Sequence, residues 1–390
     1  MTAPDQIHAS VLFASARLAF DDEVDADLAG ILEDQRECGR LLAKAEAHGM
    51  RPLLYRFLIG QNSICRDQER TKICSTLQEF TQWNLRKNLR MTGELVVLVR
   101  MFAGHGINII PFKGPTLAAL AYGDLGLREF ADLDLLIARP DFIRAQELLI
   151  ARGYQPEFQL NGRQAEVFAE ACNVMAFWHA EKEILVELHW ELSPKYLPFS
   201  PDPERLRERM ISSQPGGQTV MTLSPEDLLV YLCAHGAKHV WEKLIWVVDV
   251  AGLIKRHSNL DWRRVYDLAA RHRCERVLSL GLRLASDVAG ISTPPEMDRL
   301  MESDRESARL AAKVIQRLHS DSNSRLSRSA ESLFIFRLQR LWFDKIRSFA
   351  RIATTPSAAD WLSFPILRRA AWAYPLLRPI RLMGKLLRGE

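Results

Sequence analysis

The chain has 390 residues, of which 47% are hydrophobic and 26% charged, a composition typical of a soluble globular protein with room for two or three packed units. No apolar run reaches the roughly 18 residues that a membrane-spanning helix needs, and no basic segment precedes the short apolar stretch of the N-terminus, which argues against a signal peptide. The formal net charge of +4 is unevenly distributed along the chain. Residues Arg337 to Glu390 contain eleven Lys and Arg and three Asp and Glu, a net charge of +8, so the remaining residues have a net charge of −4. A main body with this weak negative charge is not expected to coat nucleic acid.

The first predicted elements are helices. Hydrophobic residues recur at helical spacing over Asp27–Gly49, where Gly49 provides a stop signal, and over the short segment Arg51–Gly60. A longer helix is predicted over Thr76–Gly106. Residues 1–105 therefore form a predicted N-terminal helical region.

The next segment, residues 106–192, mixes short strands with short helices. A β-branched run predicts a strand, and the following "GPTLAALAYG" has Pro just inside its start and Gly at its end, as helices do. The predicted order is β-α-β-α-β-β, which gives an α+β fold: a small mixed-sheet core flanked by helical regions. The predicted elements are strand "INIIPF", helix "GPTLAALAYG", strand "ADLDLLIA", helix "RPDFIRAQELLIARGY", and strands "NVMAFWHA" and "EILVELHW" joined by a tight "EK" turn.

After a Pro-rich linker, a helical C-terminal domain is predicted over 193–320. Its clearest signal is Ser224 as an N-cap, with Pro225 at the first helical position and Asp227 three residues after the cap. Residues 321–390 form a basic tail rich in Trp, Phe and Leu. Three interpretations of the tail stay open: packing on the protein's own core, contact with an anionic membrane surface, and binding of a peptide or nucleic-acid partner.

Three acids stand inside predicted strands. In "ADLDLLIA", Asp132 and Asp134 project from the same face of the strand because side chains alternate with a period of two. In "ILVELHW", Glu187 shares a face with His189, and its neighbours Val186 and Leu188 point the other way. Neighbouring buried carboxylates repel unless a cation lies between them, so the pattern predicts a divalent metal site. The alternative for each acid alone is a surface edge position or a salt bridge.

A candidate phosphate-binding turn precedes the first acid pair. Gly114 at the start of a helix leaves backbone N–H groups free and lets a phosphate approach closely, and Lys113 adds a positive charge.

Three blocks in this order resemble the uncharacterised bacterial nucleotidyltransferase family of the polymerase-β-like superfamily: "PFKGPTLAALAYGDLGLREFADLDLLI", "VELHW" and "LSPEDLLVYLCAHGAKHVWEKLIWVVDVAGLI". The resemblance runs from the helical N-terminus to about residue 260. It implies a nucleotidyltransferase core in which Gly114 stands at the phosphate turn, Asp132 and Asp134 form the metal pair, and Glu187 is the third acid. Pro115 departs from the pattern, because the superfamily commonly has a Ser after this Gly.

The function implied by the resemblance is metal-dependent transfer of a nucleoside monophosphate from an NTP, with ATP expected, to an unidentified small-molecule or peptide acceptor, with release of pyrophosphate. The expected cofactor is Mg²⁺, with Mn²⁺ as an alternative. Arg128, Lys238 and His239 are further candidates for nucleotide binding; the alternatives are a solvated loop arginine and a polar helix face that packs against the core. The general base is Asp134 or Glu187, and the sequence does not decide between them.

Two other functions remain open from the sequence. One is a nucleotide-binding or partner-binding module without catalysis, and the other is a membrane-surface or peptide-binding scaffold carried by the tail. The weakly acidic body disfavours long nucleic acid as a partner. Six cysteines without C-x-x-C spacing fit reduced thiols, so the expected location is the cytoplasm, with membrane association through the tail as an alternative.

Overall fold

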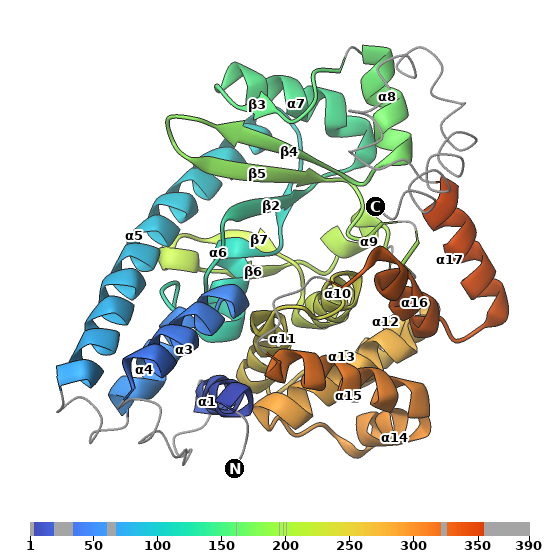
Figure 1. Ribbon diagram of the computed structural model, residues 1–390. Helices are drawn as coiled ribbons and strands as arrows, with labels where there is room; N and C mark the ends of the chain where they lie inside the picture. Colours follow the sequence, from blue (N-terminus) through green and yellow to red (C-terminus); the bar gives the residue numbers. More distant parts are fainter. Residues whose placement is uncertain are drawn as a thin grey trace, which may run out of the picture.

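The computed structural model describes residues 4–18, 34–60, 68–160, 162–194, 196–197, 199, 201–320 and 326–354. A five-stranded mixed sheet lies among helices from both ends of the chain, which confirms the predicted α+β fold (Figure 1). The strand order is β1-β2-β5-β4-β3; β2 and β5 are parallel, and the other neighbours are antiparallel. The strands are β1 (Ile110–Pro111), β2 (Asp132–Leu136), β3 (Gln155–Pro156), β4 (Val174–His179) and β5 (Ile184–His189), and a separate hairpin contains β6 (Ile211–Ser213) and β7 (Val220–Thr222).

The N-terminal region is helical, as predicted. Residues 27–33 of the helix predicted over Asp27–Gly49 lie outside the described residues. The described part ends at the predicted Gly49, whose φ of 68° is the left-handed conformation that glycine adopts without strain. The first helix was not predicted. The helices are α1 (Pro4–Leu18), α3 (Gln35–His48), α4 (Arg51–Gly60) and α5 (Gln68–Gly104).

The core contains the predicted strands and helices and two further elements. The short helix α6 (Gly114–Leu117) continues as a π-helical turn, Ala118–Tyr122, and α7 (Phe142–Ala151) follows β2. Between α7 and β4 lie β3 and α8 (Gly162–Ala171), which the sequence analysis missed. β3 has two residues and α8 has few large apolar side chains, so neither produces a strong periodic signal.

The C-terminal region is helical except for the β6–β7 hairpin, which the predicted linker-and-helix order did not include. Each strand of that hairpin has three residues, too few for a period-two pattern. Ser224 caps α10 as predicted: its hydroxyl accepts the Asp227 N–H and lies 2.9 Å from the Asp227 carboxylate. The helices are α9 (Pro203–Arg207), α10 (Pro225–Lys238), α11 (Leu244–Arg256), α12 (Trp262–Arg271), α13 (Glu275–Ala289), α14 (Pro295–Ser303), α15 (Arg305–His319), α16 (Arg328–Leu338) and α17 (Trp342–Thr354).

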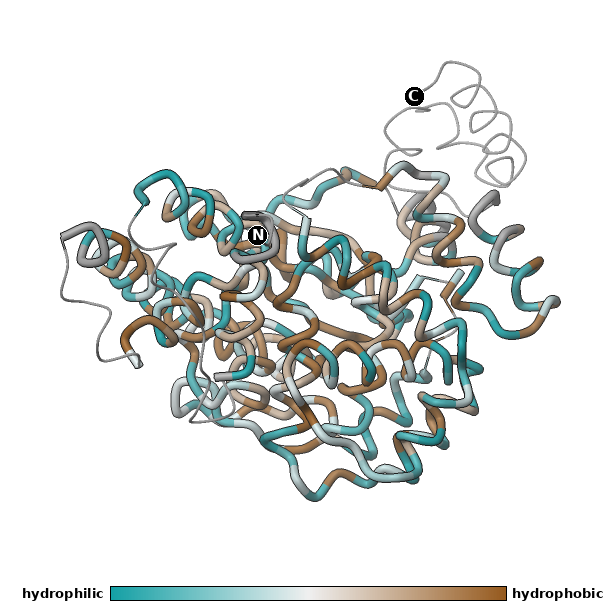
Figure 2. Tube along the Cα trace, turned by 60° about the horizontal axis from the view of Figure 1, so that its bottom comes forward, coloured by the Kyte–Doolittle hydropathy of each residue, from teal (hydrophilic) through white to brown (hydrophobic). Residues whose placement is uncertain are grey.

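Two hydrophobic cores lie on either side of the sheet. The first joins α1, α3 and α4 to α10, α11, α13 and α15, so helices from opposite ends of the chain share one interior. The second joins the C-terminal half of α5 to the other face of the sheet and to α7 and α8. Hydrophobic segments gather towards the middle of the molecule, and hydrophilic ones follow its outer helices (Figure 2). The packing therefore connects the two helical regions. The domain boundaries at 105, 192 and 320 stay a prediction.

None of the helices in the described ranges combines the length and the hydropathy needed to cross a lipid bilayer.

The close contact between α10 and the turn that follows it gives a stability prediction. A Cβ added at Gly236 would lie 2.6 Å from three ring atoms of Trp241, whose side chain is fully buried. Gly236→Ala should therefore destabilise the protein by about 1–3 kcal/mol through overpacking. Thermal unfolding followed by circular dichroism measures the effect. Gly39→Ala in α3 is the matched control, because its added Cβ meets nothing within 4 Å. A melting temperature for Gly236→Ala at or above that of the wild type would contradict the packing.

Candidate functional site

The parallel pair β2–β5 brings the predicted acids together. In its register Asp134 lies opposite Glu187, and Leu136 lies opposite His189. The alternate residues Val186 and Leu188 are fully buried on the other face of the sheet, as the period-two pattern predicts. One strand pairing therefore places Asp134, Glu187 and His189 on one face of the sheet.

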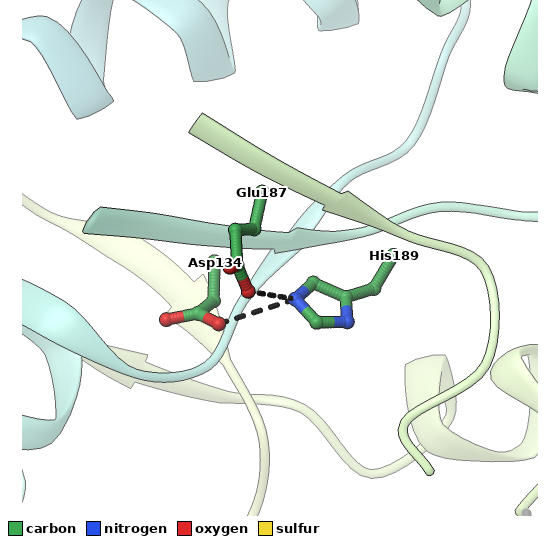
Figure 3. A group of neighbouring side chains, drawn as sticks. All are labelled: Asp134, Glu187 and His189. Atoms are coloured by element: carbon green, nitrogen blue, oxygen red, sulfur yellow. Dashed lines mark hydrogen bonds and ion pairs between the residues drawn. The ribbon is translucent and has the colours of Figure 1, made fainter. Parts of the chain in front are cut away.

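The side chains of these three residues converge (Figure 3). His189 Nε2 lies 3.2 Å from Asp134 Oδ1 and 3.2 Å from Glu187 Oε2. One ligand atom from each residue lies within 4.8 Å of the other two, a spacing that a single metal ion can bridge. Asp132 is outside this group of three: it stands at the first position of β2 and is partly exposed.

Lys113 supplies a positive charge to the same cluster. Its Nζ lies 2.7 Å from Asp134 Oδ1, and both side chains are almost completely buried. Burial acts to raise the pKa of Asp134, but Lys113 and the hydrogen bond from His189 outweigh it and bring this pKa down to about 2. Burial acts to lower the pKa of Lys113, and the attraction of Asp134 reverses this effect and raises it well above its usual value. The Asp134 carboxylate is therefore held ionised.

The other two acids differ from Asp134 in charge environment. Burial and the neighbouring Asp134 carboxylate raise the pKa of Asp132 to about 6. Burial also acts to raise the pKa of Glu187, but the hydrogen bond from His189 lowers it below its usual value. The Glu187 side chain is 31% exposed and the Asp134 side chain is 0% exposed, so of this pair Glu187 is the one that solvent reaches.

The turn before α6 requires a glycine. Gly114 has a φ of +53°, and a Cβ there would lie 3.0 Å from the backbone oxygen of Asp132. The turn is thus packed directly against the strand that carries the acids. The Thr116 hydroxyl, in the first turn of α6, donates to the Lys113 carbonyl at 2.9 Å and is buried, so it stabilises the turn itself.

This geometry predicts the effect of a single methyl group. Gly114→Ala should cost about 1–2 kcal/mol from the left-handed backbone and should also displace the turn from Asp132, which raises the KM for the nucleotide. Gly217→Ala is the matched control, because Gly217 has a φ of +77° but its added Cβ meets nothing within 4 Å. Steady-state kinetics with both variants checks this. An equal change in KM for both would mean that the turn does not bind nucleotide.

A group of basic side chains lies at the C-terminal end of α10. Tyr231, earlier in α10, packs edge-on against Phe112, and Phe112 packs edge-on against His189. Burial and the charge of Lys113 lower the pKa of Lys238. Burial and the charge of Lys238 lower the pKa of His239 to about 3. The charges of Lys113 and Lys238 therefore act on each other and hold the His239 imidazole in its neutral form. Basic groups with shifted pKa values of this kind are typical of functional sites.

The ring of Trp246, on α11, packs against two histidine rings at the C-terminal end of α10. The His235 and His239 rings lie 4.9 Å apart by centroid, and the Trp246 ring lies 5.3 Å from the first and 5.1 Å from the second. Trp246 was not predicted from the sequence, because it comes from a different helix and no local pattern marks it.

Arg128 lies away from solvent, paired with a carboxylate from α11. Its Nε and Nη2 donate to the two oxygens of Asp249 at 2.8 and 2.9 Å, and the Tyr122 hydroxyl donates to the same carboxylate at 2.7 Å. Asp249 is thus engaged in a structural pairing. The role of Arg128 in nucleotide binding stays a prediction, and its two strongest hydrogen-bonding positions are already occupied.

The chemistry of the cluster fits a divalent cation. Asp134 Oδ2 is buried and has no hydrogen-bond partner within the described part of the chain. A buried carboxylate oxygen without a partner is costly, and a metal ion is one way to satisfy it. Two carboxylates and one imidazole are a common donor set for divalent ions.

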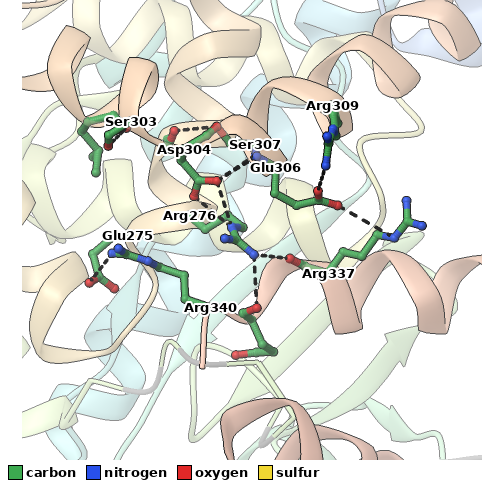
Figure 4. A network of polar contacts seen from close by, with 12 residues as sticks. Glu275, Arg276, Ser303, Asp304, Glu306, Ser307, Arg309, Arg337 and Arg340 are labelled. Carbon is green, nitrogen blue, oxygen red and sulfur yellow. Dashed lines mark hydrogen bonds and ion pairs between the residues drawn. The ribbon is translucent and has the colours of Figure 1, made fainter. Parts of the chain in front are cut away.

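The described part of the basic tail is attached to the helical region (Figure 4). Arg276 of α13 binds Asp304 at 2.8 Å and donates to the carbonyls of Arg337 and Gln339 at the C-terminal end of α16. α17 contacts the body through Ser348, which donates to the Tyr196 carbonyl.

The same helix also exposes apolar side chains. Trp342, Phe343 and Ile346 are each more than half exposed. Residues 355–390, which hold most of the predicted tail, lie outside the described residues. Contact of the tail with a membrane or a peptide stays a prediction.

Comparison with known protein families gives one match. A family model described as an uncharacterised nucleotidyltransferase matches residues 34–290, which include every residue of the cluster, the glycine turn and the basic group of α10. Neither the curated proteins nor the solved structures give a significant match to the chain.

Proposed function

We propose, because the chain belongs to the family of uncharacterised nucleotidyltransferases, that it transfers a nucleoside monophosphate from an NTP to an acceptor and releases pyrophosphate. One observation carries the proposal: Asp134 and Glu187, opposite each other on parallel strands, point their carboxylates at a common position beside the turn formed by Lys113 and Gly114. Phosphoryl chemistry of this kind depends on positioning and charge stabilisation, and the cluster can supply both.

Asp134 and Glu187 would hold a divalent metal ion, together with Asp132, the other member of the acid pair that the family resemblance implies. Such an ion, Mg²⁺ or Mn²⁺, would neutralise phosphate charge and lower the pKa of an acceptor hydroxyl. The buried Asp134 carboxylate, ionised through its contact with Lys113, is suited to bind a cation at neutral pH.

The basic side chains would bind the phosphates. Lys113 lies at the turn, and Lys238 and His239 approach from the end of α10. An anion between Lys113 and Lys238 would reduce the repulsion between their ammonium groups, and the neutral His239 imidazole would be available as a hydrogen-bond donor, which supports a triphosphate subsite here. Gly114 lets the phosphates approach the backbone because it carries no side chain.

Glu187 is better placed than Asp134 to accept the proton of an acceptor hydroxyl. A general base has to come within hydrogen-bond reach of the proton it removes. The Asp134 side chain is 0% exposed, and the Glu187 side chain is 31% exposed. We therefore assign the proton transfer to a Glu187 carboxylate oxygen.

We propose ATP as the nucleotide and a small molecule or peptide as the acceptor. The residues before Arg337 carry a net charge of −4, which disfavours long nucleic acid.

The test combines binding with turnover. Isothermal titration with each of the four NTPs, with and without Mg²⁺ or Mn²⁺, should show metal-dependent binding of at least one. Pyrophosphate release should then appear when fractionated small molecules and peptides from a cell extract are added as acceptors. Mass spectrometry identifies the product through the added nucleotide. Binding without any turnover would instead support a nucleotide-binding module, and absence of binding would contradict the proposal.

A further inference from the structure

We infer that His189 is a direct metal ligand through Nε2, together with Asp134 and Glu187, and that this mixed ligand set favours a first-row transition ion such as Mn²⁺ over Mg²⁺. The inference rests on the proposed function, since it assumes that the cluster holds a metal ion. It differs from the all-carboxylate set of Asp132, Asp134 and Glu187 that the family resemblance implies.

The first argument is the spacing of the ligand atoms. An ion about 2.1 Å from two adjacent ligands holds them about 3.0 Å apart in octahedral geometry and about 3.4 Å apart in tetrahedral geometry. His189 Nε2 lies 3.2 Å from an oxygen of Asp134 and 3.2 Å from an oxygen of Glu187, between these two values. The two Nε2 distances therefore match neighbouring ligands on one ion. The Asp134 and Glu187 ligand oxygens lie within 4.8 Å of each other, so a bound ion would draw these carboxylates together.

The second argument is the fixed orientation of the imidazole. The His189 residue is 5% exposed, and its ring packs edge-on against Phe112 at a centroid distance of 5.2 Å. Phe112 is in turn held edge-on by Tyr231 at 5.1 Å. Nε2 points towards both carboxylates (Figure 3), so the ring is already turned as a ligand would be.

Asp132 is less well placed than His189 to reach the two carboxylates. It is the first residue of β2, and its side chain is partly exposed. It is also absent from the group of ligand atoms within 4.8 Å of one another. His189 therefore takes the third position on this ion, and Asp132 is left at the partly exposed edge of the site.

The choice of metal follows from the ligand types. Mg²⁺ strongly prefers oxygen ligands and keeps several of its waters, and imidazole suits transition ions. We expect Mn²⁺ to bind about tenfold more tightly than Mg²⁺, and we expect His189→Gln to reduce this difference, because carboxylates and waters suit both ions.

The experiment is pulsed electron paramagnetic resonance of Mn²⁺ added alone to the full chain. Coordination by His189 predicts electron spin echo modulation from a directly bound ¹⁴N nucleus. When ¹⁵N is introduced only into the imidazole rings of the histidines, the ¹⁴N modulation should be replaced by ¹⁵N modulation. This replacement shows that the bound nitrogen belongs to a histidine ring and not to a lysine or to the backbone. His189→Gln should abolish the modulation, and His105→Gln, at an exposed histidine outside the cluster, should retain it.

The outcomes separate the inference from the proposed function. Mn²⁺ that binds without histidine nitrogen coupling would overturn the inference and leave a metal-dependent enzyme. A protein that binds no Mn²⁺ would overturn both. Isotope labelling uses the wild-type chain, so the result does not depend on whether His189→Gln folds.

Discussion

Asp134→Asn should reduce metal-dependent NTP turnover by about 10³-fold or more, because a catalytic metal ion supplies several kcal/mol of charge stabilisation. The substitution preserves the shape of the side chain and removes the charge at the centre of the cluster. It would also leave the Lys113 ammonium, only 11% exposed, without its carboxylate partner at 2.7 Å. Pyrophosphate release under saturating nucleotide measures the loss.

Asp141→Asn is the control, since Asp141 is a partly exposed acid just before α7, 3.7 Å from Arg144 and outside the cluster. The stability of Asp134→Asn adds a second readout. If Asp134 only repelled the neighbouring acids, its loss would leave the melting temperature unchanged or raise it. Because Asp134 also makes a buried contact with Lys113, we expect the melting temperature to fall. Undiminished turnover in Asp134→Asn would remove Asp134 from the metal site.

Arg128→Met should destabilise the protein by about 3–5 kcal/mol, because it leaves the buried Asp249 carboxylate without its guanidinium partner. The two residues are 121 positions apart in the sequence, so their ion pair connects the loop before β2 to α11. The Tyr122 hydroxyl would remain as a donor to Asp249 but carries no charge. Thermal and urea unfolding measure the change.

A second variant tests the reason for that loss. Arg128→Met combined with Asp249→Asn removes the buried charge and should recover part of the stability. If Arg128 instead serves mainly to bind nucleotide, the single variant should keep the wild-type melting temperature and lose affinity for NTP. That result would contradict the structural role of the pair.

The face of the strand on which each acid lies could be predicted from the sequence because the relevant rule is local. Side-chain alternation within one strand placed Glu187 and His189 on a single face and Val186 and Leu188 on the other. The parallel pairing of β2 with β5 is not local, and no pattern within either strand specifies that Asp134 lies opposite Glu187. The acids could therefore be proposed from the sequence, but only the register of β2 and β5 shows that Asp134 lies opposite Glu187.

The partners of the charged residues were the harder part to predict. Asp134 was expected to need a metal ion for compensation, but Lys113 and His189 also contact it. Arg128 was interpreted as a solvent-exposed or phosphate-binding arginine, because its partner Asp249 lies on a helix far along the chain. Short elements such as β3 and β6 were missed for a different reason, since two or three residues carry no measurable period.

The most direct measurement is a crystal structure with Mn²⁺ and a non-hydrolysable NTP analogue, with data collected at a wavelength where manganese scatters anomalously. We predict an anomalous peak between the carboxylates of Asp134 and Glu187, with the phosphates of the analogue beside Lys113 and Gly114. A nucleotide and a metal bound elsewhere in the molecule, or an analogue bound there without any manganese peak, would contradict the account.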